Sequence, residues 1–520
     1  MHTVPRRIPG RAVAGAALGL LALALLFAAT GPVEAQSLGE FEKNVTVHTL
    51  ANGWTFIIVE RPIAPVFTFA TYVDVGSAQE VPGITGIAHM FEHMAFKGTD
   101  RIGTSDFEKE KVALAKIEAT YRAYDTERRK SKPDAAKLKD LEKAWNDAQE
   151  EADKFVVKNE FDEIVDTQGG VGLNAGTSND STVYFYSLPS NKLELWAYLE
   201  SDRFMKPVFR EFYKERDVVK EERRMRTESQ PVGRLFEQFL AAAYIAHPYG
   251  MPVVGYMSDL NAFSLTDAEA FYKKYYVPAN ITTAIVGDVK AAEVIPLIEK
   301  YFGRIPKGEP PPPVRTVEPP QNGERIVRLK DPAQPVYLEG YHMPGVNDPD
   351  DEVYDAIGTI LGGGRTSRLY RGLVRDKQIA SVVQAFPGFP DGKYPSLFTV
   401  FAFPAKGHTA DEVRDAVHAE LDRLRKEDVS DAELAMVKAR AKADLIRSLA
   451  SNGGLAQNLS QNQALSGDWR ELFRGVERLD RVTKADIKRV ANTTFLETNR
   501  TVGIIETTGS AASKPAPAGE

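Results

Sequence analysis

The chain has 520 residues, enough for two to four domains, and its 43% apolar and 26% charged residues are ordinary for a globular protein. A net charge of −7 without a long basic block argues against nucleic-acid binding. The lack of cysteine excludes disulfide bonds, iron–sulfur clusters, thiolate zinc sites and a cysteine nucleophile.

Residues 1–35 have the pattern of a signal peptide. Three arginines precede an apolar stretch at 12–29, and Val33-Glu34-Ala35 has small residues where a signal peptidase reads them. Cleavage after Ala35 and a periplasmic or exported location are therefore expected. An uncleaved membrane anchor is the alternative, because the apolar stretch is near the minimum length for a span. The choice between Sec and twin-arginine export stays open.

The next segments, residues 45–60 and 66–75, have the apolar and β-branched character of strands. Asn52-Gly53 within the first favours a hairpin turn.

Residues 86–98 contain a His-x-x-Glu-His pattern made by His89, Glu92 and His93. On a helix, two histidines four residues apart project from one face, and their converging imidazoles suit a Zn²⁺ ion. Glu92 is close enough to take a proton from a water at that ion, as a general base does in hydrolysis. This is the reverse of the His-Glu-x-x-His helix of zinc proteases. A buried helix with two incidental histidines is the alternative.

Residues 103–160 predict an antiparallel helical hairpin. Apolar and aromatic residues recur there at helical spacing on both sides of Pro133, and charged residues fill the other positions. We interpret the charges as a solvated surface rather than a binding site.

An extended segment is expected at 173–188 and an amphipathic helix at 191–204. A further helix is expected at 211–227, where Glu215 and Glu222 share a face with Val218 and Val219. If that face is buried, its carboxylates need a metal, a cation or hydrogen-bond donors. Either glutamate, rather than Glu221, is thus a candidate third metal ligand. Pairing with an arginine such as Arg216 or Arg226 is the alternative.

Two halves are separated by a proline-rich linker at 308–323 and repeat one another. A Leu-x-x-apolar-Ser/Thr-x-x-Asp pattern begins at Leu260 and at Leu479, and each copy is followed by an asparagine that opens an apolar strand, at Asn280 and Asn499. We expect an α+β fold of two homologous αβ domains, each an antiparallel-rich sheet with packed helices. The zinc-binding domain spans 36–307 with the hairpin inserted, the second spans 324–507, and 508–520 is a disordered tail.

With these motifs, the chain resembles the insulinase/pitrilysin family of zinc metallopeptidases over residues 40–507, and within it the branch of mitochondrial and bacterial processing peptidases. The resemblance implies that Glu222 is the third ligand and Glu215 a supporting carboxylate. It also implies that Asn174, Ala175 and Thr177 belong to an edge strand to which a peptide substrate adds as a further strand.

One departure from the family concerns the second half. Complete active sites of the family take an Arg and a Tyr from that half to hold the substrate carbonyl, and Ser381 stands at the Tyr position. A serine hydroxyl is too short to replace a phenol there.

The resemblance therefore predicts a zinc endopeptidase for extended peptides or unfolded segments, with one Zn²⁺ per chain and Glu92 as the catalytic base. One alternative is a zinc-bearing subunit that is active only with a related partner chain without zinc. Another is a non-catalytic peptide-binding or scaffold protein. The chain could pair with such a partner or with a second copy of itself. Substrate identity, cleavage specificity and oligomeric state cannot be read from the sequence.

Overall fold

The computed structural model describes residues 38–508, so the predicted signal peptide, and the predicted tail apart from Thr508, lie outside the described residues. A short helix, α2 (Leu38–Phe41), and a 3-10 turn (Glu42–Asn44) open the described chain. One body begins at Asn44 and contains all the remaining elements. No helix within residues 38–508 has the length and apolar character needed to cross a bilayer.

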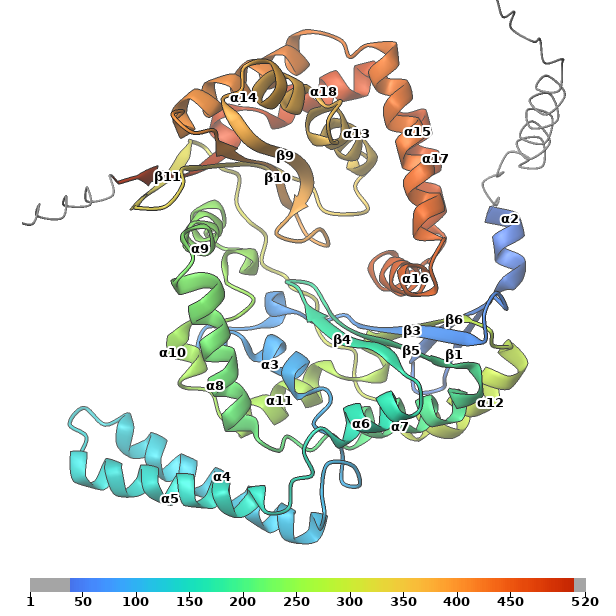
Figure 1. The fold of residues 1–520 in the computed structure, drawn as a ribbon, viewed down its shortest axis with the longest axis vertical. Helices are drawn as coiled ribbons and strands as arrows, with labels where there is room; N and C mark the ends of the chain where they lie inside the picture. Colours follow the sequence, from blue (N-terminus) through green and yellow to red (C-terminus); the bar gives the residue numbers. More distant parts are fainter. Residues whose placement is uncertain (1–37, 509–520) are drawn as a thin grey trace, which may run out of the picture. The chain divides into compact units, whose positions relative to one another are not determined.

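The first half is built on a six-stranded sheet in the order β1-β2-β6-β3-β5-β4 (Figure 1). β2 and β6 are parallel, and the other neighbours are antiparallel. The strands are β1 (Val45–Thr49), β2 (Thr55–Glu60), β3 (Val66–Val73), β4 (Val171–Thr177), β5 (Thr182–Pro189) and β6 (Ile281–Gly287). The extended segment expected at 173–188 is thus a hairpin, since a turn at 178–181 separates β4 from β5.

The second half repeats this pairing with five strands in the order β7-β11-β8-β10-β9. Here β7 and β11 are the parallel pair, and β8, β10 and β9 follow antiparallel, as β3, β5 and β4 do in the first half. The strands are β7 (Arg325–Asp331), β8 (Val336–Met343), β9 (Ala380–Phe389), β10 (Ser396–Pro404) and β11 (Arg500–Thr507). Each half is therefore one copy of the same mixed α/β unit.

Helices pack against both sheets (Figure 1). In the first half they are α3 (Ile87–Met94), α4 (Phe107–Arg128), α5 (Ala135–Asp153), α6 (Glu160–Thr167), α7 (Leu193–Met205), α8 (Phe212–Arg223), α9 (Pro231–Ala243), α10 (Met257–Leu260), α11 (Leu265–Tyr275) and α12 (Ala291–Tyr301). In the second half they are α13 (Asp351–Gly362), α14 (Ala410–Lys426), α15 (Asp431–Ser448), α16 (Asn452–Ser466), α17 (Glu471–Arg481) and α18 (Lys484–Thr494).

The repeated sequence pattern forms the same local structure in both halves. Ser264 and Thr483 cap α11 and α18, and in each case an aspartate three residues later completes a capping box. Asn280 and Asn499 then each donate a hydrogen bond to a carbonyl at the end of the preceding helix. These polar contacts join the end of the helix to the start of strand β6 or β11.

One helix from each half packs against the sheet of the other half. Helix α9 lies on β7 and β11, and α16 lies on β3 and β6. The fit beneath α9 is close, because a side chain at Gly340 of β8 would meet the Phe239 ring at 2.9 Å. At the start of α16, Arg61 donates to the carbonyl of Ala450 at 2.8 Å. The two halves are therefore interlocked, although the linker separates them along the chain.

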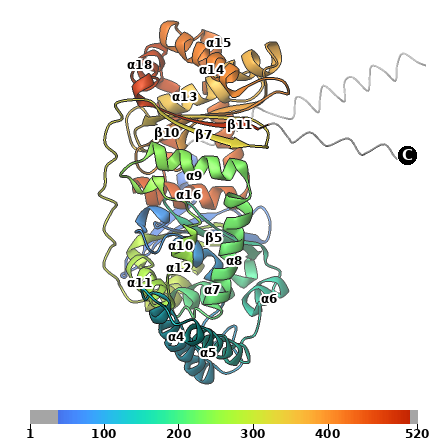
Figure 2. The ribbon, with the colours of Figure 1, turned by 90° about the vertical axis from the view of Figure 1, so that its left-hand side faces the viewer.

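The hairpin of α4 and α5 projects from the first half, on the side away from the second sheet (Figure 2). A buried ion pair anchors it: Arg210 donates to Glu110 at 2.8 Å, and both side chains are at most 1% exposed. Arg210 also donates to the carbonyls of Thr99 and Ile102, in the segment that follows α3. The hairpin is thereby fixed to the segment that directly follows the helix carrying the histidines.

We expect Arg210→Ala to lower the free energy of unfolding by about 3–5 kcal/mol, because it leaves the Glu110 carboxylate buried without a partner. Chemical denaturation followed by circular dichroism measures this change. Lys143→Ala, which removes an exposed ion pair with Asp147 on α5, is the control and should leave the midpoint unchanged. Equal midpoints for both variants would contradict the role of Arg210.

Candidate metal centre

Helix α3 begins at a glycine that the local packing requires. Gly86 has a φ of +89°, and a side chain there would meet the carbonyl oxygen of Val254 at 2.6 Å. The buried carboxylate of Glu80 accepts hydrogen bonds from the N–H groups of Gly86 and Ala88 at 2.8 Å. Burial raises the pKa of Glu80 to about 8, although these donors act in the opposite direction. The start of the helix is thus fixed by protein groups alone, without a metal.

The sequence of α3 divides into two faces. Ile87, Met90, Phe91 and Met94 are buried in the core of the first half. This burial fixes the rotation of the helix about its axis.

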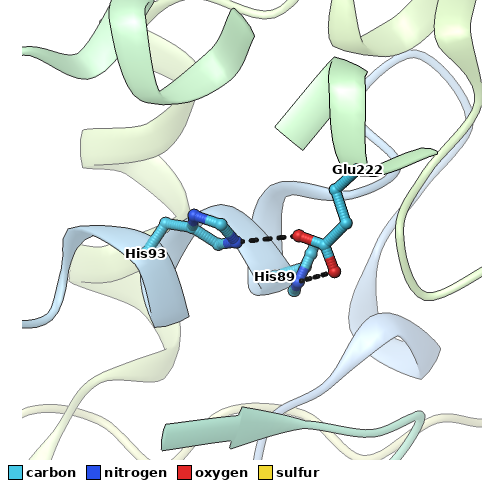
Figure 3. Close-up of side chains that lie close together, drawn as sticks. All are labelled: His89, His93 and Glu222. Carbon is cyan, nitrogen blue, oxygen red and sulfur yellow. Dashed lines mark hydrogen bonds and ion pairs between the residues drawn. The ribbon is translucent and has the colours of Figure 1, made fainter. Parts of the chain in front are cut away.

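The opposite side of α3 brings two imidazoles to one carboxylate (Figure 3). Glu222, from α8, lies with one oxygen 3.2 Å from His93 Nε2 and the other 3.7 Å from His89 Nε2. A ligand atom from each of the three residues lies within 4.8 Å of the others. Glu222 lies about 130 positions after the two histidines in the sequence, and the fold brings its carboxylate to them.

These three residues fit a zinc ion. A tetrahedral ion with bonds of about 2.0–2.2 Å holds its ligand atoms about 3.3–3.6 Å apart. The distances from the two Glu222 oxygens to the histidine nitrogens, 3.2 and 3.7 Å, lie on either side of this range. Two nitrogens and one carboxylate oxygen are ligands that zinc prefers, and they leave a fourth position open. Burial lowers the pKa of His89, against the pull of the Glu222 and Glu92 carboxylates, which favours the neutral imidazole that binds metal.

The predicted burial of this face of α8 is correct for the glutamates but wrong for one valine. The side chains of Glu215 and Glu222 are 17% and 15% exposed, whereas Glu221 is 62% exposed. Val219 is buried, but Val218 is 49% exposed because it lies at the edge of the face. The predicted single helix at 211–227 also differs: α8 ends at Arg223 and a π-helical segment (Arg224–Glu228) continues it.

Glu215 contacts the His93 ring at Nδ1, the nitrogen that faces away from Glu222. Its carboxylate lies 3.6 Å from His93 Nδ1 and 2.5 Å from Lys97 Nζ. Burial alone would raise the pKa of Glu215, but its interactions with His93 and Lys97 lower it below its ordinary value. Burial likewise opposes protonation of His93, yet Glu215 and Glu222 raise its pKa overall. An ionised Glu215 orients the ring so that Nε2 faces the cluster.

We expect Glu215→Gln to weaken zinc binding by about 10- to 100-fold without removing it, since an outer partner of a ligand is lost. Competition with a zinc-chelating dye measures this affinity. Asp217→Asn, at an exposed position on the same helix, is the control. If the two variants bind zinc equally tightly, Glu215 has no supporting role.

A cavity of about 460 Å³ opens beside the cluster, and His89, Glu92 and Glu222 line it. Glu92 Oε2 lies 3.9 Å from His89 Nε2, so its carboxylate faces the cluster without belonging to the group of three ligands. This is a suitable position for a base that acts on a water beside the metal.

The edge strand β4 forms one wall of the cavity through Gly176 and Thr177. Thr177 Oγ1 is buried and has no hydrogen-bond partner among the described residues. Asn174 and Ala175 lie earlier on the strand, where the Asn174 side chain accepts from the Ala175 N–H, and they are not among the lining residues. β4 pairs only with β5 in its sheet, so its other edge can pair with a peptide.

Comparison with known proteins identifies the family. The model of the insulinase family, peptidase family M16, matches residues 55–129 and 153–256, and the model of the peptidase M16 inactive domain matches 262–441. The zinc protease PqqE of Helicobacter pylori is 31% identical over 439 residues, which cover 82% of this chain and 84% of that protein. The chain belongs to the M16 family. The gap between the two insulinase matches falls inside the hairpin: it contains the turn and nearly all of α5, whereas α4 lies within the first match.

Solved structures agree with this M16 fold. The crystal structure of a protease from Helicobacter pylori superposes with a TM-score of 0.74 at 28% identity, and covers 89% of this chain and 99% of that one. A peptidase M16 inactive domain from Pseudomonas fluorescens has a TM-score of 0.69 at 17% identity, over 90% of this chain and 99% of that one. At 17% identity the second likeness shows the fold alone. Its name also shows that the M16 fold occurs in domains without activity.

In this M16 chain, the second half reaches the site indirectly. Ser381 lies exposed on β9 and donates to the Phe403 carbonyl. The described residues that line the cavity all lie between His89 and Val254, so Ser381 is not among them. The second half does hold the turn between β4 and β5, where Asp180 accepts from the Lys393 N–H at 2.9 Å.

Sequence reasoning missed Glu80, Lys97 and Asp180. Each acts through a partner that is distant in the chain or through backbone groups, so no spacing in the sequence identifies it.

Proposed function

We propose that this chain is a zinc-dependent endopeptidase that hydrolyses peptide bonds in extended peptides or unfolded protein segments. The names of its relatives, which include several zinc proteases, support zinc and proteolysis in general. The observation that carries the proposal is the convergence of His89, His93 and Glu222 beside Glu92, in a cavity walled by an open strand edge.

In this proposal His89, His93 and Glu222 hold the zinc. The bound ion would supply a Lewis acid that acidifies a water molecule and polarises the substrate carbonyl. Glu92 accepts the proton of the attacking water at its carboxylate and then delivers it to the leaving amine nitrogen. The backbone of β4 binds the peptide as an added strand, which holds the scissile bond in an extended conformation beside Glu92.

The test is cleavage of an unstructured, fluorescence-quenched peptide by the purified, zinc-loaded chain. We expect cleavage that stops with a chelator and returns with added zinc. A protein that binds zinc and peptide but cleaves nothing would contradict the proposal and would favour the non-catalytic binding protein.

A second candidate is a subunit that needs a partner. It is favoured by Ser381 and by a cavity whose described lining comes from the first half. In that case a related chain, or a second copy of this one, would supply the groups that hold the substrate carbonyl. Light scattering combined with the peptide assay separates the cases, because full activity from a monomer excludes a required partner.

We also propose a periplasmic or exported location after removal of the signal peptide. N-terminal sequencing of the protein from its host would then begin at Gln36. A mature N-terminus at Met1 would contradict this.

A further inference from the structure

One positive side chain lines the cavity beside the metal cluster. Arg226 is the only arginine or lysine among the described residues that line it. It lies on the π-helical segment after α8, its side chain is 76% exposed, and its Nη1 is 2.5 Å from Glu222 Oε1. The guanidinium therefore binds a carboxylate that is also a predicted metal ligand.

The other charges in the cavity are few. Glu237 is already paired, since Arg223 donates to both of its oxygens at 2.9 and 3.1 Å. This leaves the carboxylates of Glu92 and Glu222 opposite Arg226, a net negative charge. A dipositive ion held by the cluster reverses that sign.

When the net charge of the cavity becomes positive, Arg226 can attract an anion from the substrate. Once Glu222 shares its charge with an ion, its attraction for the guanidinium is offset by the charge of the ion. Apolar walls formed by Phe236, Leu240, Val253 and Val254 reduce screening inside the cavity. A guanidinium binds a second carboxylate through paired hydrogen bonds. The loaded site thus favours an anion from the substrate.

We propose that Arg226 selects substrates with a carboxylate close to the scissile bond, and that this preference depends on metal in the site. The proposal rests on the proposed function and names its substrate class. Two peptide groups supply the same chemistry: an Asp or Glu side chain, and the free carboxylate at a peptide C-terminus.

The experiment measures binding rather than turnover. Fluorescein-labelled peptides that differ only in Glu, Gln or Lys at one position, with amidated C-termini, are titrated into zinc-loaded Glu92→Gln protein and followed by anisotropy. Series with the variable residue on either side of the central bond, and one series with a free C-terminus, separate the two sources of carboxylate. Arg226→Gln and Arg226→Glu are made in the same background.

We expect the Glu peptide to bind about two- to fivefold more tightly than the Gln peptide, the upper range for an exposed charge pair. Arg226→Gln should abolish this ratio, Arg226→Glu should reverse it in favour of Lys, and removal of zinc should reduce it. The matched control is Arg224→Gln, which lies on the same segment, pairs with Glu221 and does not line the cavity.

A Glu-to-Gln ratio that Arg226→Gln leaves unchanged would overturn the proposal, as would the absence of binding by every peptide. The two proposals fail separately. Protein that binds the Glu peptide through Arg226 but cleaves nothing contradicts the proposed endopeptidase alone. Protein that cleaves all peptides equally, with or without Arg226, contradicts only the selection by charge.

Discussion

Glu92→Gln is expected to bind one zinc ion per chain and to cleave the test peptide about 10²- to 10⁴-fold more slowly, the range for loss of a general base. Glutamine keeps the shape of glutamate but cannot take a proton. Glu92 is not one of the three clustered ligands, so the metal should remain. Zinc content by mass spectrometry and kcat from quenched-peptide assays give the two quantities on the same preparation.

The matched control for this variant is Glu221→Gln, an exposed glutamate on α8 that pairs with Arg224. It should keep both zinc and activity. Turnover at the wild-type rate in Glu92→Gln would remove Glu92 from the mechanism. Loss of zinc from that variant would instead make Glu92 part of the metal site.

Glu222→Ala is expected to weaken zinc binding by more than about 100-fold, because it removes one of three ligands rather than an outer partner. The fold of the metal-free protein should be retained, since Glu222 is at the wall of a cavity and not in the hydrophobic core. Dye competition measures the affinity, and circular dichroism checks the fold.

Glu221→Ala, one position earlier on the same helix, separates loss of the ligand from a general effect on α8. We expect it to bind zinc as the unmodified chain does. If Glu222→Ala retains tight zinc binding, the third ligand must be another group, and Glu215 would be the first to examine.

Much of the fold could be predicted because local patterns determine it. Asn52-Gly53 forms the turn between β1 and β2, where Gly53 has a φ of +102° that glycine adopts readily. The repeated caps at Ser264 and Thr483 indicated that the two halves share one unit. The exchange of α9 and α16 between the sheets could not be foreseen, because an amphipathic pattern shows which face of a helix is buried but not which sheet covers it.

The site divides in the same way. The spacing of His89 and His93 within one helix required that they converge, so the sequence was sufficient for them. The prediction of Glu222 as third ligand required the family resemblance, because the helical face alone left Glu215 and Glu222 equally possible. That face also included Val218, which is exposed, because a helical projection does not define where the buried surface ends. Arg226 appeared in the sequence only as an alternative partner for the glutamates. Its place in the cavity wall depends on the tertiary fold, which brings residues of α9 and β4 to the same cavity.

The most direct test of the metal centre is anomalous diffraction at the zinc absorption edge from crystals of the zinc-loaded protein. We predict one anomalous peak per chain, within bonding distance of the imidazoles of His89 and His93 and the carboxylate of Glu222. A peak elsewhere, or no peak among these three side chains, would contradict the account.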